Sequence, residues 1–133
     1  MWATLTVEGE FEQHDGVPEL EQMQTFVTGP TQRGRALVEV VEIKHGITMW
    51  INEEGKYEDP RRNHRATFFA HEAKAIYAQD FICGNVLFTG GADDEGETEG
   101  LNAEQLAYVS QAGRMKEIGF PGSGIWNMTG IAL

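Results

Sequence analysis

The stretch ALVEVVEIKHGITMWINEEGKYEDPRRNHRATFF, from residue 36 to residue 69, decides the fold of this chain. Its first half predicts two strands, over 36–43 and 47–52, joined by a tight turn at His45–Gly46. The first run is apolar on both faces apart from two glutamates, which predicts a central strand whose faces are both covered. Together the two runs predict a β-hairpin, the best-defined local structure in the chain.

The second half of this stretch predicts a turn and then the start of a helix. Residues 52–55 have the composition of a turn and end on a glycine that is free to adopt a positive φ. Asp59–Pro60 matches an N-cap followed by a proline at the first helical position. The helix is expected to reach at least Ala70, and the residues also allow it to continue to Gln79.

The other helices and strands are predicted from the spacing of apolar residues, from helix-capping residues and from turn residues. We expect a strand over 2–13, a helix over 18–28, a strand over 81–89 with a bulge at Gly84, and a helix from the cap Asn102 to Gly119. The order β-α-β-β-α-β-α predicts an α+β fold, with a mostly antiparallel sheet of about four to five strands packed with two to three helices. One domain is expected over 1–133, with a mobile acidic loop at 90–100 and a tail, 120–133, that forms a strand or contacts a partner.

The charge of the chain limits the kinds of partner it can have. Twenty-one acidic residues against ten basic ones give a formal net charge of −11. A nucleic-acid binder usually has the opposite balance, because phosphate contacts need Lys and Arg, so no direct nucleic-acid binding is expected. Strong negative charge favours solubility, basic partners or mimicry of a polyanion. Neither a secretory signal nor an apolar run long enough to span a membrane is present, which predicts a cytoplasmic protein.

No catalytic motif is recognisable, so the sequence predicts a non-enzymatic protein without catalytic residues, metal or cofactor. Cys83 lies among apolar residues of a predicted strand and is interpreted as a small buried core residue. The histidines do not share a metal-ligand spacing, and the acidic loop does not match the ligand spacing of an EF-hand.

A basic cluster supplies the candidate binding residues: Asn52, Arg61, Arg62, Asn63 and Arg65. At a helix start, arginine forks and backbone N–H groups suit a phosphate, a carboxylate or an acidic partner. The alternative is that these arginines pair with local acids, and the sequence favours it because four acids lie between residues 53 and 59.

A second candidate is an acidic interaction surface that would imitate the phosphates of DNA. Its members would be Glu8, Glu10, Glu12, Asp93, Asp94, Glu95, Glu97 and Glu99. The first three alternate along the predicted strand over 2–13 and would share one solvated face. Mimicry requires that they lie together with the acids of the 90–100 loop.

Residues 39–91 contain an ordered set of motifs: VEVVEI, INEEGK, PRRNHRAT and ICGNVLF, followed by a Gly- and acid-rich loop. In this respect the chain resembles a family of small proteins with a domain of unknown function, found mainly in bacteriophages and mobile elements. The resemblance implies a phage accessory protein in the cytoplasm of an infected bacterium that binds and modulates a host protein. A DNA mimic, or a binder or enzyme for a small anionic ligand, remains an alternative. An exposed sheet edge would also allow a homodimer.

Overall fold

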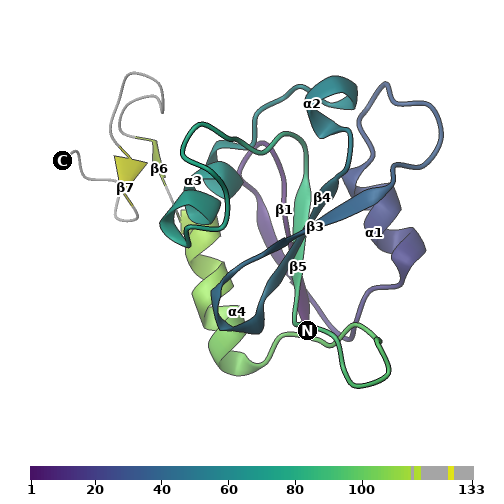
Figure 1. The fold of residues 1–133 in the computed structure, drawn as a ribbon, viewed down its shortest axis with the longest axis vertical. Coiled ribbons are helices and arrows are strands. Elements are labelled where there is room, and N and C mark those ends of the chain that lie inside the picture. The colour runs from purple at the N-terminus through teal and green to yellow at the C-terminus, as the bar shows by residue number, and fades with distance from the viewer. Residues whose placement is uncertain (115, 118–125, 128–133) are drawn as a thin grey trace.

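The computed structural model describes residues 1–114, 116–117 and 126–127. Its centre is a five-stranded sheet in the order β2-β1-β5-β4-β3, in which every neighbouring pair is antiparallel (Figure 1). The strands are β1 (Trp2–Leu5), β2 (Phe11–His14), β3 (Val38–Glu42), β4 (Thr48–Asn52) and β5 (Val86–Thr89). The predicted α+β fold with an antiparallel sheet is confirmed.

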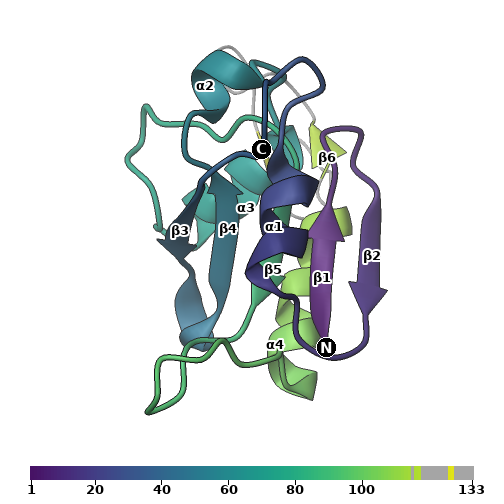
Figure 2. The same cartoon turned by 90° about the vertical axis from the view of Figure 1, so that its right-hand side faces the viewer.

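Three main helices cover the sheet: α1 (Leu20–Val27), α3 (His64–Glu72) and α4 (Ala103–Ser110). Helix α1 lies on one face, and α3 and α4 lie on the other (Figures 1 and 2). A short helix, α2 (Gly55–Glu58), follows β4. Two 3-10 turns, Lys44–Gly46 and Gln111–Arg114, and a small separate pair, β6 (Lys116–Glu117) with β7 (Trp126–Asn127), complete the described elements.

The sheet separates two hydrophobic clusters. The smaller one joins α1 to the sheet through Met23, Val27 and Leu87. The larger one lies under α3 and α4, where the Phe69 and Phe88 rings meet edge to face with centroids 5.6 Å apart. Burial on both faces explains why β5 begins with three apolar residues and is fully buried along its whole length.

The N-terminal segment is a hairpin, and the prediction of one strand over 2–13 is wrong. Gly9 adopts a φ of +90°, a conformation that L side chains rarely reach, and so the chain turns back there. The turn is closed by hydrogen bonds from the Thr6 N–H to the Glu10 carbonyl at 3.0 Å and from the Gly9 N–H to the Thr6 carbonyl at 2.9 Å. Glu8 therefore lies in a turn, and the three glutamates do not line one strand face.

The predicted hairpin is confirmed, but its first strand, β3, lies at the edge of the sheet and not at its centre. The positive φ values of His45 and Gly46 make the turn. The central position belongs to β5, which pairs with β1 on one side and β4 on the other. None of the residues of β3 is fully buried, so the apolar run indicated neither two covered faces nor a second neighbouring strand.

Helix α3 begins later than the sequence predicts, and it passes Ala70 as expected but ends at Glu72. Asn63 is its N-cap, whereas Asp59 ends α2, and Gly55 begins α2 without a positive φ. The Asp59 carboxylate is bound by Arg61 and is not available to cap a helix. After Glu72 the chain leaves the helix at Lys74, whose φ is +55°, so the helix does not continue to Gln79.

The C-terminal part of the prediction is only partly described. The capping box between Asn102 and Gln105 is present, and Val109 and Ala112 of this segment are fully buried. The expected helix end at Gly119 and most of the 120–133 tail lie outside the described residues. Among the helices that the structure describes, none is long and apolar enough to cross a membrane.

Candidate interaction surface

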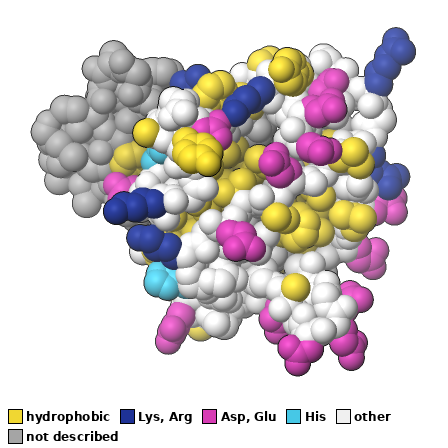
Figure 3. All heavy atoms as spheres, viewed as in Figure 1, with side chains coloured by type: hydrophobic (Ala, Val, Ile, Leu, Met, Phe, Trp, Pro, Cys, Tyr) yellow, Lys and Arg dark blue, Asp and Glu magenta, His cyan; other side chains and the backbone are white. Residues whose placement is uncertain are grey.

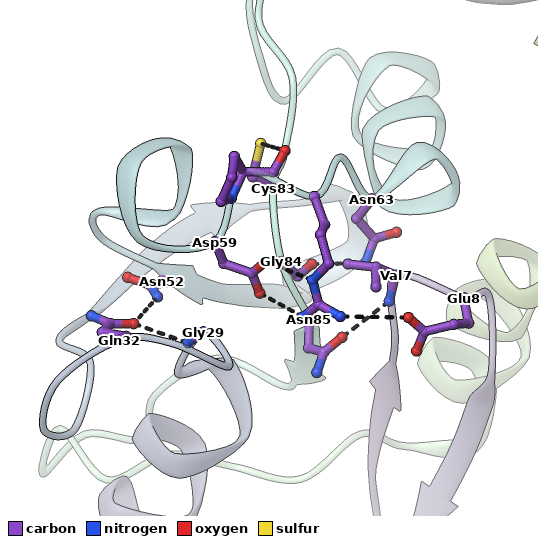
Figure 4. Close-up of polar contacts among 12 residues, drawn as sticks. Val7, Glu8, Gly29, Gln32, Asn52, Asp59, Asn63, Cys83, Gly84 and Asn85 are labelled. Atoms are coloured by element: carbon purple, nitrogen blue, oxygen red, sulfur yellow. Dashed lines mark hydrogen bonds and ion pairs between the residues drawn. The ribbon is translucent and has the colours of Figure 1, made fainter.

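The five residues of the predicted basic site do not form one site. Arg61 forms a fork on the Asp59 carboxylate, with Nε–Oδ1 and Nη2–Oδ2 distances of 2.7 and 2.8 Å, and its third nitrogen lies 3.6 Å from Glu8 (Figure 4). The hydrogen bond with Asp59 raises the pKa of Arg61, so this guanidinium remains charged. Pairing with a local acid, the alternative reading of the sequence, is confirmed for this arginine.

The other two arginines point to different parts of the molecule. The Arg62 guanidinium lies over the Phe81 ring, 3.9 Å from its centroid. Arg65 donates a hydrogen bond to the Gly113 carbonyl, and its side chain packs so closely against Gly9 that a Cβ there would lie 2.5 Å from Nε. Arg65 thus joins α3 to the β1–β2 turn and to the chain after α4.

Both asparagines are buried structural residues. The Asn63 Oδ1 accepts from the Ala66 N–H at 3.0 Å, and its Nδ2 donates to the carbonyls of Gly84 at 3.0 Å and Leu5 at 3.3 Å. Asn52 donates to the Val27 carbonyl and to Gln32, and so fixes the end of α1 against β4 (Figure 4). These bonds use the polar atoms that an external ligand would need.

The predicted acidic surface is divided between two ends of the sheet. The β1–β2 turn, which contains Glu8 and Glu10, lies beside Asn85, whose Oδ1 accepts from the Val7 N–H at 3.0 Å. The 90–100 loop leaves the opposite end of β5 and returns beside Met1, whose carbonyl accepts from the Leu101 N–H at 2.7 Å. Figure 2 shows this loop at the far end of the sheet from the β1–β2 turn.

A surface that the sequence analysis missed surrounds the open edge of β3. We call it the β3 surface, and its exposed apolar side chains are Leu37, Val40, Tyr57 and Tyr77, with exposed fractions of 63, 48, 89 and 79%. In the view of Figure 1 β3 lies toward the reader, and Figure 3 shows hydrophobic side chains gathered on this face with acidic side chains among them. The signal in the sequence is the apolar run over 36–43, which contains Leu37 and Val40 and which predicts a strand with neighbours on both sides.

Two hollows border the β3 edge. One, of about 490 Å³, lies between residues 39–42 and the loop that contains Lys74 and Tyr77. The other, of about 230 Å³, lies between β3, α2 and Ile82, and Cys83 contributes to its wall. Cys83 is buried as predicted, and its burial raises the pKa of the thiol.

In β3, the backbone N–H and C=O groups of every second residue point away from β4. The Ile43 N–H bonds to the Ile47 carbonyl at 2.8 Å, and the Glu53 N–H bonds to the Leu37 carbonyl at 2.9 Å. Both pairs fit the β3–β4 register, and antiparallel hydrogen bonds alternate along a strand. The odd-numbered residues therefore bond to β4, and the N–H and C=O groups of Val38, Val40 and Glu42 point away from the sheet.

This alternation predicts losses of stability of different size for proline at two adjacent positions. Val41→Pro removes a donor to β4 and is expected to lower the free energy of unfolding by about 2 kcal/mol. Val40→Pro removes an outward N–H and is expected to cost less than about 1 kcal/mol, because proline is tolerated at such edge positions. Urea unfolding followed by circular dichroism measures both. Equal losses would contradict the assigned alternation.

Lys56 and Asp80 form an ion pair beside the smaller hollow. Burial alone would raise the pKa of the Asp80 carboxyl, but hydrogen bonds from Lys56 and from the Phe81 N–H hold it below its ordinary value of 3.8. Both side chains remain partly exposed, so solvent screens the pair and its contribution is expected to be below about 1 kcal/mol.

A carboxyl group whose pKa is lower in the folded state stabilises the fold at any pH above its pKa in the unfolded state. This stabilisation is lost as the pH falls through its pKa in the folded state. Asp80→Asn is therefore expected to lower the melting temperature slightly at pH 7 and to have no effect well below pH 3.8. Thermal unfolding at both pH values tests this, with Asp94→Asn in the exposed loop as the control. A difference that persists in acid would contradict the assigned cause.

In the described part of the chain, no group of three or more His, Cys, Asp or Glu side chains is arranged to hold a metal ion.

Comparison with known proteins gives one match. The model of a protein family described as a domain of unknown function, DUF3846, matches residues 4–114. No curated protein and no solved structure matches the chain. The family model covers the second half of β1, the other four strands of the sheet and its three main helices, and extends well beyond the 39–91 motifs on both sides. The chain therefore belongs to the DUF3846 family.

Proposed function

We propose that this chain is a non-enzymatic binding protein that modulates a host protein, and that it binds through the β3 surface. The observation that carries the proposal is an open strand edge bordered by four exposed apolar side chains and two hollows. Exposed apolar groups that gather in one place are typical of interaction sites, whereas scattered ones need no explanation. The edge adds unpaired backbone donors and acceptors to the same place.

The proposed setting is the cytoplasm of a bacterium that carries a phage or a mobile element. The motifs over 39–91 support this origin through their resemblance to proteins of such elements. Membership of a family without an assigned function is compatible with an accessory role of this kind.

The two alternatives receive less support from the geometry. A DNA mimic needs acids spread over one surface, and Glu8 and Asp93 lie at opposite ends of the sheet. A site for a small anionic ligand needs converging donors, and Arg61, Arg62 and Arg65 contact three separate groups.

Matched substitutions test whether the β3 surface binds the host protein. The chain is immobilised and exposed to bacterial lysate, either unchanged or with Leu37→Arg and Val40→Arg. The control carries Leu20→Arg and Val17→Arg, since these side chains have similar exposed fractions, 56 and 45%, at the start of α1. We expect the β3 variant to lose a specific partner that the control retains. Equal capture by both variants would contradict the proposal.

A further inference from the structure

We infer that the occupant of the β3 edge is an extended basic segment of the partner protein, which adds a sixth strand antiparallel to β3. This inference rests on the proposed function and names the chemistry of the partner. Addition of a strand to an open sheet edge is a general mode of peptide recognition, in which main-chain bonds give affinity and side chains give specificity.

The edge is open to such a strand. In the described structure β3 pairs with β4 alone, and the outward groups of Val38, Val40 and Glu42 have no strand beside them. The opposite edge, β2, is less suited, because none of the large exposed apolar side chains belongs to it. Antiparallel pairing matches the rest of the sheet and is slightly more stable per residue than parallel pairing.

The charges of β3 favour a basic strand. Residues 38–42 contain two glutamates and no basic residue, and both glutamates are exposed. Glu39 and Glu42 lie on opposite faces of the sheet, because successive side chains of a strand alternate. Oppositely charged side chains directly across two strands stabilise the pair, and like charges destabilise it.

The spacing of these glutamates specifies the partner sequence. In an antiparallel partner, the residue opposite Glu42 comes three positions before the residue opposite Glu39. The residue between them that faces Val40 shares the α1 face of the sheet with this exposed valine and with Trp50. The expected segment is basic–any–apolar–basic.

A second copy of the chain fits this edge poorly. Two β3 strands would bring together four glutamates with no basic residue between them, and each chain has a formal net charge of −11. The tail of this chain also lacks the required chemistry, because residues 120–133 contain no lysine or arginine.

A synthetic peptide with the core Lys-Thr-Val-Lys, flanked by threonines, is the probe. We expect it to bind at least about tenfold more tightly than the peptide with glutamate at both lysine positions. A scrambled peptide of equal composition, Lys-Lys-Val-Thr, controls for charge alone. Fluorescence polarisation at low and moderate salt measures the affinities, which are expected to fall as salt screens the charges.

Variants of the protein test the geometry. Val40→Pro removes the central outward N–H and is expected to abolish binding of the Lys-Thr-Val-Lys peptide, whereas Val40→Thr keeps this donor and is expected to bind. The double variant Glu39→Lys, Glu42→Lys is expected to prefer the glutamate peptide. Circular dichroism and melting temperature confirm that each variant is folded.

Hydrogen exchange gives an independent readout of the new strand. In the free protein, the amides of Val38, Val40 and Glu42 are expected to exchange faster than those of Glu39 and Val41. Bound peptide should slow the exchange of the first three, and the other two should change little.

Distinct results separate this inference from the proposed function. If the arginine variants of the β3 surface lose the lysate partner but Val40→Pro keeps it, the surface binds a partner without strand addition, and the inference is wrong. If the wild type binds the lysine, glutamate and scrambled peptides equally, or binds none of them, the inference is also wrong. A dimer in sedimentation that Val40→Pro dissociates would identify a second copy as the occupant and overturn it.

Discussion

Replacing Asn63 with alanine is expected to lower the free energy of unfolding by about 3–4 kcal/mol. The side chain is fully buried and joins three elements: it caps α3 at Ala66 and donates to the carbonyls of Leu5 and Gly84. Loss of the cap accounts for about 1 kcal/mol. The two buried carbonyls would each lose a donor, and this accounts for the remainder of the expected loss, because an unsatisfied buried polar group costs about 1–3 kcal/mol.

The chain offers a matched control for this prediction. Asn102 caps α4 in the same way, through the Gln105 N–H at 2.8 Å, but it is exposed. Asn102→Ala is expected to cost about 1 kcal/mol. Asn63→Asp would retain the cap acceptor but would place a buried carboxylate oxygen against the two carbonyls, so it is expected to destabilise the fold although the cap is kept. Urea unfolding of the three variants measures the losses, and similar values for both alanine variants would show that the interior bonds contribute nothing.

Replacing Phe69 with alanine is expected to cost about 3–5 kcal/mol, the usual range for removal of a buried aromatic ring. Phe69 is fully buried between β5 and α4, where its ring contacts Phe88 and lies 5.3 Å from the Tyr108 ring. The resulting cavity would lie at the junction of α3, α4 and the sheet, where no single element can move to fill it. Chemical denaturation measures the loss.

Tyr57→Ala is the control for Phe69→Ala. This ring lies on the short helix α2 with 89% of its surface exposed, and its removal is expected to change stability by no more than about 0.5 kcal/mol. A large loss for Tyr57→Ala would show that the β3 surface is part of the core and would count against its proposed role in binding.

Local chemistry made much of the fold predictable. The α+β class, the turn at His45–Gly46 and the capping box at Asn102 follow from residue types at fixed spacings. The position of β3 at the sheet edge does not, because it depends on where β5 pairs after a long excursion of the chain. The same limit applies to the start of α3, because the Asp59 carboxylate binds Arg61 and Asn63 caps the helix instead.

The candidate site was less predictable than the fold. Arg61, Arg62 and Arg65 lie close together in the sequence. Their side chains point in different directions, because the first two precede α3 and the third lies in its first turn, and each contacts a different group. Conversely, Val40 and Tyr77 meet at one surface only because the loop after α3 folds back beside β3.

The central place of β5 determines when this sheet can be completed. Its register pairs Phe88 with Ala3 on one side and with Met49 on the other, so the strand joins the β1–β2 hairpin to the β3–β4 hairpin. The β1–β2 and β3–β4 hairpins can form locally, but neither can join the other until residue 89 has been synthesised. Contacts of such long sequence separation slow folding. Until β5 is available, the inner edge strand of each hairpin has unpaired backbone groups that can pair with other chains. Folding is therefore expected to be slow and sensitive to protein concentration.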